Sequence, residues 1–249
     1  EVRQAGAQLP DADRQVREHV FTDPVLWVEM LLRNRDGSAR RYWPHQVTDL
    51  QCLSPNIIHL DGRDTGKSVS LTTDALYFAT TTPGASGLIA APQQGHLDSL
   101  VEEIEYQLDA SPVLRRHVAV NAAGHLKIQR KPYYRLEFKN GAVLYFRPAG
   151  TYGEAFRSLH VERVWVDEGA WLTEAAWKAL RQCLKAGGRL RIYSTPNGIR
   201  TSTYYRLTFS KGFAVFRWPS WLNPLWTPER EQELLEFYGG IDTAGWQHE

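Results

Sequence analysis

The stretch NIIHLDGRDTGKSVS, residues 56–70, sets an apolar segment, a glycine-containing loop and a helix start in direct succession. Residues 56–60 are largely apolar or β-branched and are bounded by Ser-Pro and Asp-Gly pairs, which predicts a short buried strand. Residues 68–80 carry apolar side chains at helical spacing. Strand, loop and helix in this order are the context that a phosphate-binding loop requires.

The loop itself carries the groups that bind a triphosphate. Its backbone N–H groups and the following helix N-terminus attract phosphate oxygens, and the loop residues are Gly62, Arg63, Asp64, Thr65, Gly66, Lys67 and Ser68. Lys67 is predicted to reach the β- and γ-phosphates, and the Ser68 hydroxyl to ligate magnesium. Asp61 stands where the usual pattern has its first glycine, so the loop is a variant. The alternative is a chance Gly-Lys-Ser tripeptide at a helix start.

A second motif, VERVWVDEGA at residues 161–170, is predicted to be a buried strand that ends in two carboxylates. Buried carboxylates are costly unless a cation or reactant accompanies them. Asp167 suits a magnesium ion and Glu168 suits the water that attacks ATP. The pair therefore predicts ATP and Mg²⁺ as ligands, although two exposed turn acids would give the same letters.

Three further residues are candidates with open alternatives. Arg157 precedes the carboxylate strand and is either an arginine finger for the γ-phosphate or a surface arginine. Thr195 follows residues 189–193, a predicted strand, and either senses the γ-phosphate or belongs to a turn. Gln46 ends the aromatic cluster RYWPHQ, which is either an adenine site or core packing.

The remaining pattern alternates strands and helices. Residues 1–35 are predicted to be helical with a break at Asp23-Pro24, and further elements are expected at 86–92 (strand), 93–108 (helix), 173–184 (helix), 213–218 (strand) and 227–238 (helix). Residues 125–148 alternate between apolar and polar, which indicates an antiparallel hairpin insertion whose basic side chains either touch nucleic acid or face solvent. The sequence thus predicts an α/β fold with a mainly parallel sheet flanked by helices.

Composition sets the outer limits. The chain has 249 residues, 43% of them hydrophobic and 23% charged, which is an ordinary globular composition. The net charge of +1 excludes a strongly basic nucleic-acid footprint, so any DNA contact must be local or shared within an assembly. No apolar run has the length of a membrane span, and no contact with a membrane is expected.

Together these motifs resemble the N-terminal ATPase domain of the large terminase subunit, the DNA-packaging motor of tailed bacteriophages and herpesviruses. The segment WPHQ is similar to the family's adenine motif, GRDTGKS to its deviant phosphate loop, VWVDE to its Walker B strand with the catalytic glutamate, and STPNG to its coupling motif. One departure concerns Arg157, which Ser158 follows where the family usually has glycine.

The resemblance implies a RecA-like P-loop NTPase of the ASCE class, with a strand added between the phosphate-loop strand and the Walker B strand. It implies a helical lead-in over residues 1–40, an ATPase domain over 41–240, and at 241–249 the start of a linker to a C-terminal nuclease domain. Implied partners are double-stranded DNA, a portal protein, a small terminase subunit and further copies in a homo-oligomeric ring, a pentamer, although the isolated domain could be monomeric. The implied location is the host cytoplasm.

On this reading Mg-dependent ATP hydrolysis drives double-stranded viral DNA into a procapsid. Lys67 and the loop bind phosphates, Ser68 and Asp167 hold magnesium, and Glu168 orients water. Arg157 is the finger, with Arg63 as the other candidate, and Thr195 couples hydrolysis to movement. Two alternatives stay open: one lobe of a superfamily 2-like helicase, and an ATP-binding assembly module whose turnover is incidental.

Overall fold

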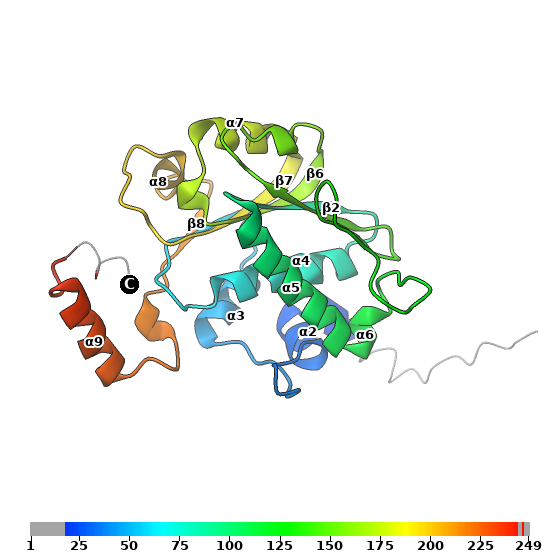
Figure 1. The fold of residues 1–249 in the computed structure, drawn as a ribbon, viewed down its shortest axis with the longest axis horizontal. Coiled ribbons are helices and arrows are strands. Elements are labelled where there is room, and N and C mark those ends of the chain that lie inside the picture. The colour runs from blue at the N-terminus through cyan, green and yellow to red at the C-terminus, as the bar shows by residue number, and fades with distance from the viewer. Residues whose placement is uncertain (1–17, 244–245, 247–249) are drawn as a thin grey trace, which may run out of the picture.

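The computed structural model describes residues 18–243 and Trp246, and its centre is a sheet with the strand order β3-β4-β5-β2-β6-β7-β1-β8 (Figure 1). The strands are β1 (Asn56–His59), β2 (Ser86–Ala91), β3 (Ile128–Gln129), β4 (Arg135–Glu137), β5 (Val143–Pro148), β6 (Val161–Asp167), β7 (Leu184–Tyr193) and β8 (Ala214–Phe216). The pairs β5–β2, β2–β6, β6–β7, β7–β1 and β1–β8 are parallel, and the pairs β3–β4 and β4–β5 are antiparallel. This is the mainly parallel α/β sheet that the sequence predicts.

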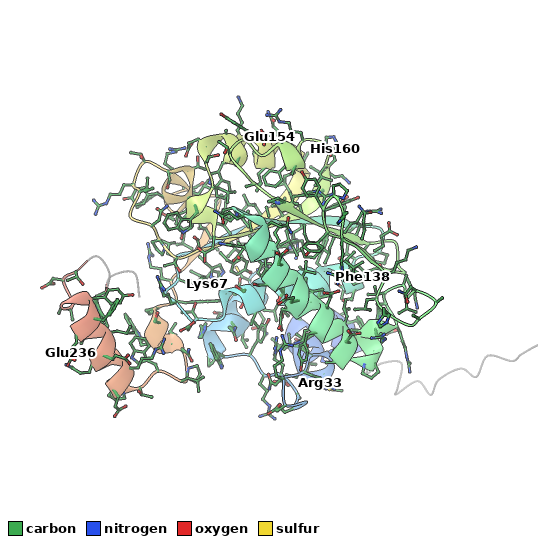
Figure 2. The ribbon with its side chains drawn as sticks, viewed as in Figure 1. Arg33, Lys67, Phe138, Glu154, His160 and Glu236 are labelled. Atoms are coloured by element: carbon green, nitrogen blue, oxygen red, sulfur yellow. The ribbon has the colours of Figure 1, made fainter. Side chains whose placement is uncertain are left out.

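Helices cover both faces of the sheet (Figure 1). One face carries α2 (Pro24–Leu31), α3 (Pro44–Leu50), α4 (Lys67–Thr81), α5 (Gln94–Ala110) and α6 (Pro112–Arg115), and the other carries α7 (Glu174–Cys183) and α8 (Thr203–Leu207). Short 3-10 turns lie at η1 (Glu154–Phe156), η2 (Gly169–Trp171) and η3 (Ser220–Leu222). The last helix, α9 (Pro228–Tyr238), buries none of its residues and stands apart from the two layers, as the position of Glu236 shows in Figure 2.

The period of two in the strands divides the core between these two layers. In β6, Trp165 belongs to the cluster under α4 and α5, whereas Val164 and Val166 belong to the cluster under α7. In β2, Ile89 and Leu88 separate in the same way. Because successive side chains point to opposite faces and both faces are covered, these strands read as continuous apolar runs.

Apolar spacing and capping residues in the sequence predicted most of the helices correctly. The loop strand and the helix after it were expected at 56–60 and 68–80, and they form as β1 and α4. Thr173 and Thr227 cap α7 and α9, and their side chains accept hydrogen bonds from Ala176 N and Arg230 N. Within the predicted lead-in, helix precedes Asp23, and the Asp23 carboxylate caps α2. Residues 1–17 of that prediction lie outside the described part.

The antiparallel hairpin expected at 125–148 forms, since β3 pairs with β4 and β4 with β5 in antiparallel fashion. It extends the main sheet, because β5 also pairs in parallel with β2 along its whole length. Two boundaries differ from the prediction. β7 begins at Leu184, five residues before the predicted start at 189, because Leu184 pairs with Val161 of β6 before a shift in register leads to the pair of Arg189 with Arg163. β8 is limited to Ala214–Phe216. No described helix has both the length and the apolar character that a membrane crossing needs.

A chain of buried charges ties α3, α4, β6 and β7 together. Asp74 of α4 accepts hydrogen bonds from Arg163 and from Trp165 Nε1, the latter at 2.6 Å, and its Oδ2 lies 3.1 Å from Arg191 Nε. Arg191 also donates to Asp49 Oδ1 of α3 at 3.0 Å. The side chains of Asp74, Arg191 and Asp49 are at most 4% exposed. Each charge therefore depends on its neighbour for compensation.

Replacing Asp74 with alanine is expected to destabilise the protein by about 3–5 kcal/mol, because it removes the buried counter-charge of Arg163 and leaves Arg191 with Asp49 alone. Urea unfolding of Asp74→Ala beside the wild type measures this. The matched control is Asp109→Ala, which removes the exposed ion pair with Arg115 and is expected to cost no more than about 1 kcal/mol. Equal losses in the two variants would contradict the structural role assigned to Asp74.

Candidate functional site

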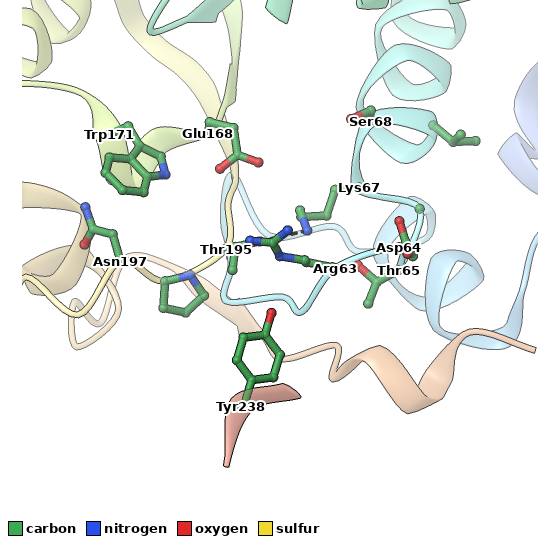
Figure 3. A pocket seen from close by; sticks show the side chains of 13 residues that line it. Arg63, Asp64, Thr65, Lys67, Ser68, Glu168, Trp171, Thr195, Asn197 and Tyr238 are labelled. Atoms are coloured by element: carbon green, nitrogen blue, oxygen red, sulfur yellow. Dashed lines mark hydrogen bonds between the residues drawn. The ribbon is translucent and has the colours of Figure 1, made fainter. Parts of the chain in front are cut away.

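The predicted site residues converge because three parallel strands end at one edge of the sheet. β7 lies between β6 and β1, so the segments that follow these strands are neighbours. They bring together the loop after β1, Glu168 after β6 and Thr195 after β7. A cavity of about 670 Å³ opens between them. Figure 3 shows Lys67 and Glu168 entering this cavity from different sides. The carboxyl edge of a parallel sheet is where ligands bind in folds of this kind.

The loop after β1 turns into α4 through Gly66, which adopts a left-handed conformation with φ +84°. A Cβ at this position would lie 2.3 Å from Gln46 Nε2, so both the conformation and the packing require glycine. Asp64 also has a positive φ, +57°. Within the described residues, the only other non-glycine residue with a positive φ is Glu168, at +50°. Both residues line the cavity, where such backbone strain is characteristic of functional sites.

Lys67 lies at the start of α4 with its amine directed at the loop and at the neighbouring strand end. Its Nζ donates to the Gly62 carbonyl and, at 3.1 Å, to Thr195 Oγ1. Burial lowers the pKa of the Lys67 amine, and the carboxylates of Asp61, Glu168 and Asp167 act in the opposite direction. The amine is thus held between strand ends, within the cavity that a phosphate would enter.

Two carboxylates end β6 in different environments. Asp167 is 6% exposed, and burial together with the adjacent Glu168 charge raises its pKa to about 7. Glu168 lines the cavity, and its Oε2 lies 3.2 Å from the Ser194 hydroxyl. Ser194 is fully buried and also accepts a hydrogen bond from Ala170 N. The Ser194 contact orients the Glu168 carboxylate toward the space that Lys67 faces.

The oxygen donors fit a magnesium ion bound together with phosphates. Ser68 is an exposed hydroxyl residue in the first turn of α4, and Asp167 offers a buried carboxylate whose raised pKa a nearby cation would lower. Magnesium takes one or two protein oxygens and completes its shell with water and phosphate oxygens. Residues 18–243 contain no cluster of three or more His, Cys, Asp or Glu residues that could hold a metal ion.

The structure brings most of the predicted site residues to this cavity. The lining includes Arg63, Asp64, Thr65, Gly66, Lys67, Ser68, Glu168 and Thr195. Gly62, Gln46, Asp167 and Arg157 do not line it. Gly62 and Asp167 lie directly beside lining residues in the chain. Arg157 is exposed at the end of η1.

Gln46 has a structural role at the loop. Its Oε1 accepts from Trp43 N at 3.1 Å and its Nε2 donates to the Gly66 carbonyl at 3.3 Å. These two contacts leave one hydrogen of the Gln46 amide available to an adenine base. Recognition of adenine by Gln46 stays a prediction.

Five further residues line the cavity, although none of them was a candidate site residue: Val69, Trp171, Pro196, Asn197 and Tyr238. Trp171 ends η2 after Glu168, Asn197 lies two residues after Thr195, and Tyr238 ends α9 (Figure 3). Asn197 belongs to the STPNG turn, which was a signal that could have been extended. Tyr238 is brought there by long-range contacts: Arg230 of α9 pairs with Asp64 at 2.9 Å.

Comparisons with known proteins support this fold. No protein-family model matches the chain, and no curated protein matches it either. Among solved structures, the ATPase domain of the Thermus phage P74-26 large terminase is similar, with a TM-score of 0.62 and 17% identity over 88% of this chain and 97% of that domain. The HK97 bacteriophage large terminase gives a TM-score of 0.67 and 10% identity over 86% of this chain and 47% of that one.

A third similar structure is the large terminase of a thermophilic bacteriophage in complex with ADP, with a TM-score of 0.62 and 15% identity over 83% of this chain. The present chain spans 52% of that protein, about half its length. These likenesses establish that the chain has the fold of phage large terminase ATPase domains, as the resemblance in the sequence predicted. They confirm the RecA-like fold class, and β7 is the strand expected between the phosphate-loop strand and the carboxylate strand.

The perturbed pKa of Asp167 predicts a stability cost that depends on pH. Between about 3.8 and about 7, the folded protein holds a proton on Asp167 that the unfolded chain releases, so this group destabilises the fold as pH rises through that interval. Asp167→Asn is therefore expected to unfold less readily than the wild type above pH 7, by on the order of a few kcal/mol, and the gain should vanish below about pH 4.

Urea unfolding at a series of pH values measures the Asp167 effect. Asp242→Asn, a substitution of an exposed aspartate, serves as the control and is expected to track the wild type. A stability gain in Asp167→Asn that stays constant over the whole pH range would show that burial of the charge is not its cause.

Proposed function

We propose that this chain is an Mg-dependent ATPase domain of a large terminase, which converts ATP hydrolysis into movement of double-stranded viral DNA into a procapsid. One observation carries the proposal: a phosphate-loop lysine, Lys67, and a strand-end glutamate, Glu168, line the same cavity at the carboxyl edge of a RecA-like sheet. The likeness to terminase ATPase domains, including one protein in complex with ADP, supports it.

In the proposed reaction, Lys67 and the loop N–H groups bind the phosphates. Lys67 must exchange its present contacts with the Gly62 carbonyl and Thr195 for phosphate oxygens, and this exchange makes Thr195 a sensor of the bound state. Ser68 and Asp167 would hold magnesium, which neutralises phosphate charge when it is bound. Arg63 lines the same cavity and is placed to contact the γ-phosphate.

Glu168 is assigned to the attacking water. Its carboxylate is oriented by Ser194 and faces the cavity, so it can accept a hydrogen bond from a water and align that water for attack. Phosphoryl transfer needs positioning and charge stabilisation more than covalent chemistry, which is what this arrangement of fixed donors and acceptors offers.

Arg157 is proposed to act on a neighbouring subunit. It is exposed on η1 and does not line the cavity of its own chain, which agrees with a finger supplied from one copy to the next in a ring. A ring would also let several subunits each contribute a few basic residues to the DNA backbone, so the net charge of +1 poses no obstacle. The portal protein and the small terminase subunit are the proposed partners, and the host cytoplasm is the proposed location.

ATP hydrolysis measured over a range of protein concentrations tests this function. Turnover per subunit is expected to rise with concentration, and Lys67→Ala, Glu168→Gln and Arg157→Ala are each expected to lose it, the last by on the order of a thousandfold or more. An equimolar mixture of Arg157→Ala with Glu168→Gln should recover part of the activity, because the mixture forms interfaces that combine an intact Glu168 with an intact Arg157.

The control for Arg157 is Arg116→Ala, an exposed arginine in the loop after α6 on the opposite face of the sheet. Full activity in Arg157→Ala would place the finger elsewhere. Unchanged turnover in Glu168→Gln would contradict the enzyme assignment and favour a module in which ATP only fixes an assembly interface.

A further inference from the structure

Asp61 is an unexpected residue in a phosphate-binding loop. It occupies the position where the usual pattern has its first glycine, and its side chain is fully buried beneath the loop. Its Oδ1 accepts a hydrogen bond from Trp218 N at 3.1 Å, and its backbone N–H donates to the Ser194 carbonyl at 3.0 Å. A phosphate site relies on positive potential, so a carboxylate here would oppose ligand binding unless another group neutralises it.

His59 lies against this carboxylate. Its Nδ1 is 3.0 Å from Asp61 Oδ2, and its Nε2 is 3.2 Å from Asp49 Oδ1 of α3, the second contact being an ion-pair distance without the alignment of a hydrogen bond. The imidazole is fully buried and stacks between the rings of Tyr193 and Phe216, with centroid separations of 4.4 Å and 5.0 Å. Aromatic faces on both sides favour the cationic form of the ring.

His59 is shared between the carboxylates of Asp49 and Asp61. Asp49 also has Arg191 at 3.0 Å and a hydrogen bond from the Tyr193 hydroxyl at 3.0 Å, so His59 is not its only compensation. Burial lowers the pKa of His59, but the Asp49 and Asp61 carboxylates outweigh it and raise the pKa to about 9. At neutral pH the ring is therefore an imidazolium, and it supplies Asp61 with a counter-charge in direct contact, ahead of the charge of Lys67.

We propose that His59 is a positioning residue that neutralises Asp61, and that it thereby leaves Lys67 and the loop N–H groups with the net positive charge that phosphates require. The inference rests on the proposed nucleotide-binding function of the same loop. Without His59, Asp61 would either draw Lys67 toward itself or take up a proton. A Lys67 amine drawn toward Asp61 would bind phosphate more weakly. Protonation of Asp61 would prevent this loss of affinity, but only at a pH below the pKa of Asp61.

A double-mutant cycle of ATP affinity tests the pairing. His59→Gln removes the charge and keeps a hydrogen-bond donor, and Asp61→Asn removes the carboxylate with little change in shape. We expect His59→Gln to weaken ATP binding roughly tenfold to a hundredfold when Asp61 is present, and by less than about threefold when Asp61→Asn is already in place. Fluorescence titration with a labelled ATP measures each dissociation constant, and a urea melt of each variant accompanies it. Equal losses in both backgrounds would overturn the proposal.

The loss should also depend on pH. In His59→Gln the lone Asp61 carboxyl, whose pKa burial raises, is neutral at low pH and charged at high pH. The ratio of variant to wild-type dissociation constants is thus expected to be larger at about pH 8.5 than at about pH 6. A merely structural role of His59 would give a ratio independent of pH. His125→Gln, an exposed histidine far along the chain, is the control and should match the wild type at both values.

If His59→Gln does not fold, the pH dependence of ATP binding by the wild type and by Asp61→Asn tests the proposal instead. The groups that face His59 are Asp49 from α3, Asp61 from the loop and Tyr193 from β7, and burial raises the pKa of the Tyr193 hydroxyl well above its ordinary value. Deprotonation of His59 near pH 9 should weaken ATP binding in the wild type, and Asp61→Asn should lack this decline. Identical pH profiles would overturn the inference.

Failure of the nucleotide site and failure of the His59 role give different results. Wild-type protein that binds no ATP, or Lys67→Ala that binds ATP as the wild type does, would overturn the proposed nucleotide site and this inference with it. Wild-type binding that Lys67→Ala abolishes, combined with additive effects of His59→Gln and Asp61→Asn, would overturn the role of His59 alone.

Discussion

The site depends on the parallel alignment of three neighbouring strands, β6, β7 and β1, whose carboxyl ends must meet at one edge of the sheet. This constraint places a loop, a glutamate and a threonine from separate parts of the chain around one cavity. The strands are fixed in turn by burial on both faces, since helices cover each side of the sheet. The chemistry is thus positioned by the core rather than by the loops themselves.

Buried charge is the second organising feature. A continuous series of ion pairs and charge-assisted hydrogen bonds runs from Arg163 through Asp74, Arg191, Asp49 and His59 to Asp61, directly beneath the phosphate loop. Each member is costly to bury alone, and the series persists because every charge has a partner of opposite sign. Since it ends at the loop, it connects the stability of the sheet to the electrostatics of the cavity.

The sequence predicted the parts of this structure that local patterns encode. Apolar spacing identified α4 and α5, runs of buried residues identified β2 and β6, and threonine caps marked α7 and α9. It also named eight of the residues that line the cavity. Other features escaped because they arise from contacts between distant segments. The parallel pairing of β5 with β2 and the approach of Tyr238 to the cavity are of this kind.

Asp61 illustrates the limit more sharply. In the sequence it is only a departure from a motif, and His59 is the residue that follows the two isoleucines of a short buried strand. The structure changes the meaning of both, because the pair shares a buried site with Asp49, which lies ten residues before His59 in the chain. No periodicity or spacing carries that information, since it depends on how α3 packs against β1 and β7.

A crystal structure of this protein with magnesium and a non-hydrolysable ATP analogue would test the proposed site most directly. We expect the β- and γ-phosphates on the N–H groups at the start of α4, with Lys67 Nζ on a phosphate oxygen. We expect the metal beside Ser68 and Asp167, and Glu168 facing the γ-phosphate. A nucleotide bound away from this cavity, or phosphates that Lys67 does not contact, would contradict the proposed site.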